Sequence, residues 1–327
     1  MKVGVLSGGG DAPGINAVIR AVVRKAIKYY GYETVGVRNG WRGLIEGDFM
    51  PLGLNEISGI LPRGGSILGT SRTNPFKRED GPQKILKNIK ANGIDALVVI
   101  GGEDTLGVAY KLYGMGLPCV GVPKTIDNDL VGTDYTFGFN TAVSIATETL
   151  DRLHTTAEAH HRVMILEVMG RYTGWIALEA GLAGGADVIL IPEKPFDIDE
   201  VCAYIRQRQI RGINFSMVIV AEGAKPKGCG EIIYGDGKDE FGHVRFGGIG
   251  YYLGKEIEKR IDIETRVVVL GHLQRGGSPT AFDRILATRY GIAAIDLVHE
   301  GKFGRMVGIQ GNEIVSVPLK EVAGKRK

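Results

Sequence analysis

Short hydrophobic runs alternate along most of the chain with segments whose apolar residues recur every three or four positions. The runs are typical of strands buried on both faces of a sheet, and the helical spacing is typical of amphipathic helices. This alternation predicts an α/β fold with parallel sheets. The predicted strands are 2–6, 34–38, 96–100, 119–122, 163–168, 188–191, 216–221, 267–270, 306–310 and 314–317. The predicted helices are 15–29, 83–92, one from about 105, 140–158, 172–183, 198–209, 249–260 and 279–299, while 39–47 and 223–248 are expected to be loops or, for the second, a hairpin.

Two polar loops follow the predicted strands 96–100 and 119–122. The carboxyl ends of neighbouring parallel strands face one crevice, which is where α/β proteins bind ligands. We therefore expect both loops to contribute to one site. The first loop supplies Gly101, Gly102, Glu103, Asp104 and Thr105, and the second supplies Lys124, Thr125, Asp127, Asn128 and Asp129.

The residue types in these loops suit a phosphate ligand and a metal ion. Glycine at 101 and 102 lets the backbone approach a ligand closely, and the start of a helix near Thr105 favours an anion. Glu103 offers the hard oxygen ligand that Mg²⁺ prefers, and Lys124 offers a positive point charge. Together these features predict phosphoryl transfer, in which positioning and charge neutralisation account for most of catalysis.

Asp127 and Asp129 are two residues apart, so they point the same way if their segment is extended. One would then be a general base and the other would help to hold the metal. A polar turn with helix-capping aspartates is the alternative for this segment taken alone. The glycine-rich loop beside it favours the catalytic interpretation.

A second glycine-rich loop, 7–14, lies between the first predicted strand and helix. A strand, a tight turn and a helix in this order form a phosphate cradle. The loop is a poor dinucleotide fingerprint because Gly14 comes one position late, and no Gly-Lys-Ser/Thr follows as in a Walker A loop. A nicotinamide-dependent dehydrogenase is therefore disfavoured.

Composition and charge narrow the class of protein. The 327 residues are 44% hydrophobic and carry 40 basic and 37 acidic side chains, a net charge of +3. Because a nucleic-acid or membrane-surface protein would show a basic excess, we expect neither partner. The three cysteines have no metal-ligand spacing and indicate reduced thiols. Met1 leads directly into the first strand, leaving no room for a signal peptide, and no apolar run approaches membrane-spanning length, so we expect a cytoplasmic protein.

Five motifs, SGGGDAPG, GGEDT, PKTIDND, EVMGRYTGW and GHLQRGGSP, occur in this order between Val3 and Gln310. In this combination the chain resembles the 6-phosphofructokinase family. The resemblance implies two doubly wound α/β lobes with the active site in the cleft between them. It assigns 1–138 plus about 275–303 to a phosphoryl-donor lobe, and 139–274 plus about 304–327 to a fructose 6-phosphate lobe. The last residues, 324–327, are expected to be frayed.

The resemblance also implies roles for individual residues. Asp127 matches the catalytic base, and Arg72, Thr125 and Arg171 match residues that stabilise the transferring group. Arg162 and Arg266 match residues that reach a neighbouring subunit's site, so a homo-oligomer, either dimer or tetramer, is implied. The implied donor-binding residues are Gly10, Arg72, Gly102, Asp104, Thr105 and Lys124, and the implied Mg²⁺ ligands are Glu103 and Asp129. The implied fructose 6-phosphate residues are Thr125, Ile126, Asp127, Arg162, Met169, Gly170, Arg171, Glu222, Arg266, His272, Leu273, Gln274 and Arg275.

The phosphoryl donor depends on two positions. ATP-using members of the family typically carry GGDGS and PGTIDND, whereas Asp104 and Lys124 each replace a glycine here. The Asp104 carboxylate should repel the α-phosphate of ATP, while Lys124 can grip pyrophosphate. The pair resembles pyrophosphate-dependent members, so pyrophosphate is the predicted donor and ATP the alternative. A non-catalytic regulator that binds sugar phosphates is a second alternative, disfavoured because Asp127 is present.

Overall fold

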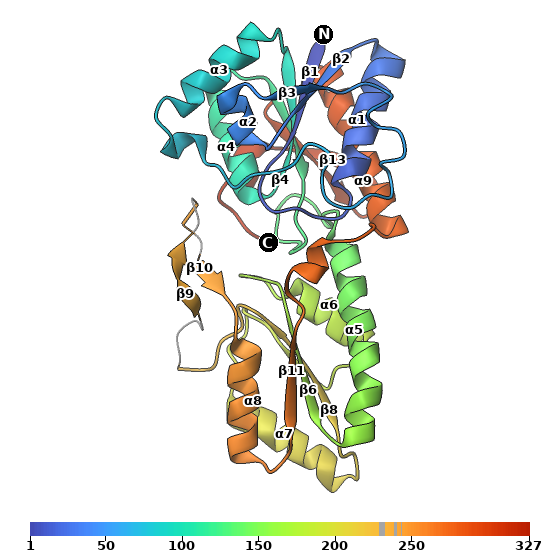
Figure 1. Cartoon of the computed structure of the whole chain (residues 1–327), viewed down its shortest axis with the longest axis vertical. Helices are drawn as coiled ribbons and strands as arrows, with labels where there is room; N and C mark the ends of the chain where they lie inside the picture. Colours follow the sequence, from blue (N-terminus) through green and yellow to red (C-terminus); the bar gives the residue numbers. More distant parts are fainter. Residues whose placement is uncertain (229–232, 239–240, 243) are drawn as a thin grey trace. The chain divides into compact units, whose positions relative to one another are not determined.

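The computed structural model describes residues 1–228, 233–238, 241–242 and 244–327, which form two compact α/β units (Figure 1). Unit 1 contains Met1–Asn140 and Arg275–Lys327, together with 241–242. Unit 2 contains the described parts of Thr141–Lys238 and 244–274. The predicted α/β class is therefore confirmed. No helix in the described part of the chain is long and apolar enough to cross a membrane.

Unit 1 is built on a seven-stranded sheet. The strands β12, β5, β4, β1 and β2 run parallel to their neighbours, while the edge strands β13 and β3 are antiparallel. Their spatial order is β13 (Glu313–Pro318), β12 (Arg305–Gln310), β5 (Cys119–Pro123), β4 (Ala96–Gly101), β1 (Lys2–Ser7), β2 (Glu33–Val37) and β3 (Phe49–Pro51).

Alternate residues of each central strand supply two separate cores, one on each face of the sheet. Val98 and Ile100 of β4 belong to the core under α1 and α9, whereas Leu97 and Val99 belong to the core under α2, α3 and α4. Both faces are thus covered, which explains why these strands are continuous hydrophobic runs. The helices are α1 (Ile15–Tyr30), α2 (Trp41–Glu46), α3 (Gly81–Ala91), α4 (Glu103–Gly114), α9 (Ala281–His299) and α10 (Leu319–Val322), with a 3₁₀ turn, η1, at Pro75–Lys77.

The chain changes direction across the sheet between β1 and β4. β1 is followed by β2 on one side, while β4 is followed by β5 on the other, although β1 and β4 are hydrogen-bonded neighbours. Such a switch point is where open α/β sheets bind ligands, outside the carboxyl ends of the strands. The loops after β1, β4 and β5 all begin at this edge, as the pairing of Ser7 with Ile100 and of Gly101 with Pro123 requires.

Unit 2 contains a four-stranded parallel sheet and a separate hairpin. Helices α7 and α8 contribute to a core with the sheet. Helix α6 approaches the sheet at Gly181, where an added Cβ would lie 2.7 Å from Ile189 and 2.8 Å from Ile219. The sheet order is β11 (Thr265–Val269), β6 (Val163–Val168), β8 (Ser216–Ala221) and β7 (Val188–Leu190), and the hairpin is β9 (Ile233–Lys238) with β10 (Val244–Phe246). The helices are α5 (Phe139–His160), which begins in unit 1, α6 (Trp175–Ala183), α7 (Ile198–Ile210) and α8 (Ile249–Arg260), with η2 at Gly271–Arg275 crossing the unit boundary.

Three expectations from the sequence are wrong. Residues 304–327 belong to unit 1 and not to the second lobe, because β12 pairs with β5 and β13 pairs with β12. The predicted loop 39–47 contains the helix α2, whose Trp41 is buried in the unit 1 core. The segment 324–327 is not frayed, since Arg326 forms a β-bridge with Leu130.

Candidate functional site

The glycine-rich loop after β1 is held in place by backbone hydrogen bonds. The Gly8 N–H donates to the Ile100 carbonyl at 3.0 Å, and the Gly9 N–H donates to the Ser71 carbonyl at 2.9 Å. Thr70 Oγ1 donates to the Gly9 carbonyl at 2.7 Å, and Gly9 has a φ of 82°, which glycine adopts readily. The segment carrying Arg72 is thereby fastened to the phosphate cradle that the sequence predicts.

Lys124 lies directly against this loop. Its side chain is buried, and Nζ donates to the carbonyls of Gly8, at 2.8 Å, and Gly10. Burial, followed by the positive charges of Arg275 and Arg72, lowers the pKa of Lys124 to about 7. Lys124 is thus hydrogen-bonded to two carbonyls of the glycine-rich loop. Its amine also binds a proton less tightly than an exposed lysine does.

Thr105 connects the loops after β1 and β4. It is buried in the first turn of α4, and a Cβ built on Gly101 would lie 2.3 Å from the Thr105 Cβ. A Cβ on Gly8 would lie 2.9 Å from Thr105 Oγ1. Only glycine fits at both positions. The N-cap of α4 is Gly102, so its first N–H groups, with Asp104 in the first turn, face this edge of the sheet.

The segment carrying Asp127 and Asp129 is not extended, contrary to the premise of the spacing argument. Asn128 has a φ of 52°, and its side chain accepts the Thr136 N–H at 3.0 Å and donates to the Asp134 carbonyl at 3.2 Å. The Asp127 N–H donates to Thr125 Oγ1 at 3.1 Å. The two aspartates are still close in space. Burial, and next the charge of Asp127, raises the pKa of Asp129 to about 7.

Glu103 is paired with a residue that the sequence argument missed. Arg326 Nε donates to Glu103 Oε2 at 2.8 Å, and the same guanidinium opposes the rise in the pKa of Asp129. The C-terminal segment therefore lies beside the acidic loops. The run of basic residues from Lys325 to Lys327 was the available signal, because it is complementary to these carboxylates in charge.

The carboxylates of Glu103, Asp127 and Asp129 suit a magnesium ion that is bound partly by the phosphates of a substrate. Glu103 and Asp127 both raise the pKa of Asp129 through their charge, which indicates a local excess of negative charge. Within the described residues no three His, Cys, Asp or Glu side chains are arranged to hold a metal ion by themselves. Mg²⁺ is usually bound through one or two carboxylates plus substrate phosphates, so the donor set fits that mode of binding.

Two of the residues expected to bind fructose 6-phosphate, Ile126 and Arg275, have side chains that pack within unit 1. Arg275 donates from Nη1 to the Asp11 carbonyl at 3.0 Å, and a Cβ on Gly10 would lie 2.8 Å from the same nitrogen. Arg275 therefore packs against the glycine-rich loop. Ile126 is fully buried, so its side chain belongs to the core and only its backbone is available to a ligand.

In unit 2, the loops after β6 and β11 meet. The Met169 N–H donates to Gln274 Oε1 at 3.2 Å, and Gln274 Nε2 donates to the Gly271 carbonyl at 3.0 Å. Gln274 is fully buried. It therefore joins the two loops through its amide.

The loop after β8 lies against the same place. The Glu222 N–H donates to the Val168 carbonyl at 2.8 Å, and a Cβ on Gly223 would lie 2.0 Å from the Arg171 carbonyl oxygen. Gly170 has a φ of 135° and lies close to the Thr173 carbonyl. Five of the residues predicted for the acceptor are thus gathered at the carboxyl ends of β6, β8 and β11, namely Met169, Gly170, Arg171, Glu222 and Gln274.

Arg162 and Arg266 share one carboxylate. Both donate to Glu264, and their strands β6 and β11 are neighbours, with Met164 opposite Arg266. The Arg162 guanidinium holds the pKa of Glu264 below its usual value. Glu264 therefore holds the two arginines together at the amino ends of β6 and β11. The exposed His272 and Leu273 follow the carboxyl end of β11, at the other end of the same strand.

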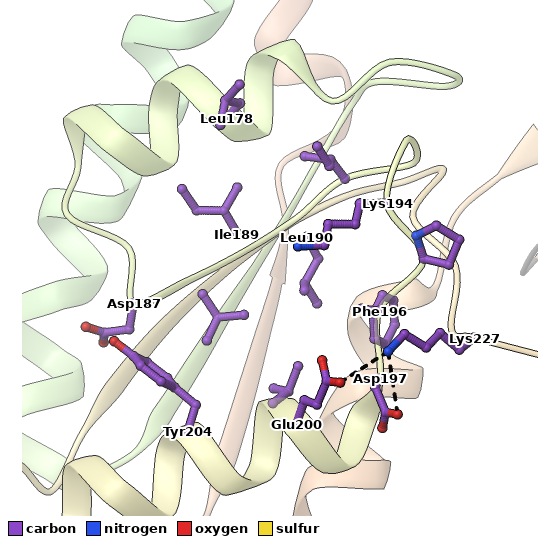
Figure 2. A pocket seen from close by; sticks show the side chains of 14 residues that line it. Leu178, Asp187, Ile189, Leu190, Lys194, Phe196, Asp197, Glu200, Tyr204 and Lys227 are labelled. Carbon is purple, nitrogen blue, oxygen red and sulfur yellow. Dashed lines mark hydrogen bonds and ion pairs between the residues drawn. The ribbon is translucent and has the colours of Figure 1, made fainter.

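A pocket of about 320 Å³ lies elsewhere in unit 2, between β7, α6 and α7 (Figure 2). Ion pairs from Lys227 to Glu200, at 3.2 Å, and to Asp197, at 3.8 Å, close one side of it. Its floor is apolar, with Leu190 and Phe196. The residues lining this pocket include none of the predicted site residues.

Comparisons with known proteins agree on one family. The family model described as phosphofructokinase matches residues 2–298. A pyrophosphate--fructose 6-phosphate 1-phosphotransferase of Streptomyces coelicolor is 59% identical, with 100% of this chain and 96% of the relative covered. An ATP-dependent 6-phosphofructokinase 3 of the same organism is 52% identical with the same coverage. The solved structure of phosphofructokinase from Saccharomyces cerevisiae matches with a TM-score of 0.84 at 33% identity, covering 98% of this chain and 45% of the yeast chain.

Proposed function

Because the chain belongs to the phosphofructokinase family, we propose that it transfers a phosphoryl group from pyrophosphate to the 1-hydroxyl of D-fructose 6-phosphate. The products are fructose 1,6-bisphosphate and phosphate, and the reaction is reversible. The enzyme is a glycolytic phosphotransferase that acts in the cytoplasm. The observation that carries the choice of donor is Lys124, which donates to the glycine-rich loop, together with Asp104 in the first turn of α4.

In the proposed reaction Asp127 accepts the proton of the 1-hydroxyl group. The resulting oxygen attacks the terminal phosphorus of the donor, and the bond from that phosphorus to the bridging oxygen breaks. Arg72, Thr125 and Arg171 stabilise the transferring group, because cationic and hydroxyl donors aimed at its oxygens offset the charge of the transition state. Magnesium, held through Glu103 and Asp129, supplies further charge neutralisation when it is bound.

Pyrophosphate suits the donor side for two reasons. Asp104 lies in the first turn of α4, and in this proposal its carboxylate repels the α-phosphate of ATP and leaves no room for the ribose. Lys124 is already buried against the cradle formed by Gly8 and Gly10, so a small anion can recruit its ammonium group. Gly102 and Thr105 offer the N-terminus of α4 to the same anion.

The acceptor belongs to unit 2 in this proposal. Met169, Gly170 and Arg171 line the sugar-phosphate pocket, and Glu222 bonds a sugar hydroxyl. His272, Leu273, Gln274 and Arg275, with Thr125 and Ile126, complete the residues assigned to fructose 6-phosphate. Arg162 and Arg266 reach the site of a neighbouring subunit, so the active form is a homo-oligomer. Their shared contact with Glu264 supports a joint role.

The donor is tested by initial rates with fructose 6-phosphate and Mg²⁺, using pyrophosphate and ATP in parallel. A strong preference for pyrophosphate supports the proposal, and chelation of Mg²⁺ should abolish turnover until the ion is restored. A preference for ATP, as the name of the 52% identical relative suggests, would refute the donor argument and leave the acceptor unchanged. The double variant Asp104→Gly with Lys124→Gly should shift the preference toward ATP.

The base is tested with Asp127→Ser. This variant should lose nearly all turnover while retaining fructose 6-phosphate binding in calorimetry, because the carboxylate acts on the proton and not on the phosphate. Near-normal turnover would show that another group is the base. Tight binding without turnover in the unmodified protein would favour a sugar-phosphate-binding regulator.

A further inference from the structure

The last residues of the described chain run alongside the acidic loop after β5. Arg326 forms an antiparallel bridge with Leu130, and the Lys327 N–H donates to the Asp129 carbonyl at 2.7 Å. Lys327 Nζ donates to the Asp134 carbonyl at 2.7 Å and more weakly to that of Thr133 at 3.3 Å. These contacts of the backbone and of Lys327 hold the segment beside the loop.

The Arg326 side chain forms an ion pair with the acidic loop after β4. Its Nε lies 2.8 Å from Glu103 Oε2, with exposed fractions of 34% for the arginine and 19% for the glutamate. One guanidinium thus serves as the counter-ion of the Glu103 carboxylate within unit 1.

We propose that Arg326 is a further residue of the donor–metal site, where it competes with the divalent ion for the Glu103 carboxylate. The inference rests on the proposed function, which assigns Glu103 as a magnesium ligand. Mg²⁺ requires oxygen ligands at about 2.0–2.1 Å in near-ideal octahedral geometry, and a guanidinium seated on the same oxygen obstructs that approach. An ion that took Oε2 as its ligand would displace Arg326 from that oxygen.

The displaced guanidinium remains beside the site because its backbone is held by Leu130 and by the contacts of Lys327. Its planar group of N–H donors is suited to phosphate oxygens. Arg326 consequently keeps the Glu103 carboxylate neutralised in the free protein and stays close to the phosphates of the donor. A purely structural role for the ion pair would not affect the affinity for a metal ion.

The test measures Mn²⁺ binding by electron paramagnetic resonance, without any donor, on the full chain and its variants. Arg326→Gln should bind Mn²⁺ about threefold to fivefold more tightly, which is the range that removal of a partly exposed ion pair allows. Arg326→Lys should restore at least part of the competition. The matched control is Lys325→Gln, which removes the same charge from an exposed neighbour and should leave the affinity at the wild-type value.

The variants separate this inference from the proposed function. Unchanged or weaker Mn²⁺ binding in Arg326→Gln would overturn the inference, as would an equal gain in Lys325→Gln. If Glu103→Gln weakens binding but Arg326→Gln has no effect, Glu103 is a ligand and only the competition is refuted. If Glu103→Gln binds Mn²⁺ as well as the wild type, the metal assignment in the proposed function fails together with the inference.

Discussion

Binding of pyrophosphate should be coupled to uptake of a proton by Lys124. Burial lowers the pKa of this lysine to about 7 from a usual value of 10.5. The difference corresponds to about 5 kcal/mol of preference for the neutral amine in the free protein. A bound anion next to Nζ favours the charged form and raises this pKa again. At pH 8 about nine-tenths of the free protein is neutral at Lys124, so donor binding should take up close to one proton.

Calorimetry at pH 8 in buffers of different ionisation enthalpy counts this proton. The wild type should take up about one proton more than Lys124→Gln, and the difference should shrink at pH 6, where Lys124 is already charged. Lys111→Gln, an exposed change on α4, is the matched control and should behave as wild type. Equal proton uptake by wild type and Lys124→Gln at pH 8 would show that the lysine is charged in the free protein or takes no part in binding.

The same lysine has a consequence for stability, and four further substitutions test individual contacts of the two units. Between pH 7 and 10.5 the folded chain holds Lys124 neutral while the unfolded chain holds it charged, so the free energy of unfolding should increase with pH across this window, less so in Lys124→Gln. Gly101→Ala should lower the unfolding free energy in urea by about 1–3 kcal/mol because its Cβ meets Thr105 at 2.3 Å, whereas Gly107→Ala has nothing within 4 Å and should stabilise α4 by roughly 0.5–1 kcal/mol. Tyr290→Phe should cost about 1–3 kcal/mol in the same assay, since the buried hydroxyl donates to the Tyr135 carbonyl at 2.6 Å. Glu264→Gln should change the free energy of unfolding by less than about 0.5 kcal/mol, because its ion pairs with Arg162 and Arg266 are partly exposed. It should raise KM for fructose 6-phosphate, because both arginines lose their common partner. An unchanged KM would show that Glu264 does not position them.

The repeating pattern of strands and helices was predictable because it depends on local periodicity. The predicted helix 249–260 coincides with α8, and the strands 163–168 and 216–221 coincide with β6 and β8. The loops at the carboxyl ends of the parallel strands were predictable for the same reason. A buried parallel strand is a continuous hydrophobic run, and the residues that follow it must lie at one edge of the sheet.

Features that depend on distant contacts were not predictable. The left-handed backbone of Asn128 follows from its bonds to Thr136 and Asp134, and these partners are not evident from local spacing. The placement of residues 304–327 depends on which strand β12 pairs with. The hydrophobic pattern of β12 is equally compatible with a place in either sheet. The position of Arg326 depends in turn on that pairing, which explains why a segment that looks frayed in sequence lies on Glu103.

The return of the chain to β5 has a consequence for biosynthesis. Strand β5 is made early, but its partner β12 emerges from the ribosome only after the whole of unit 2. Unit 2 is nearly continuous in sequence and can fold as it is synthesised. In unit 1, one edge of β5 stays unpaired until β12 has been synthesised. Parallel pairings of large sequence separation form slowly, and unpaired hydrophobic edges invite aggregation. The interval between synthesis of β5 and arrival of β12 is therefore the period in which the growing polypeptide depends most on chaperones.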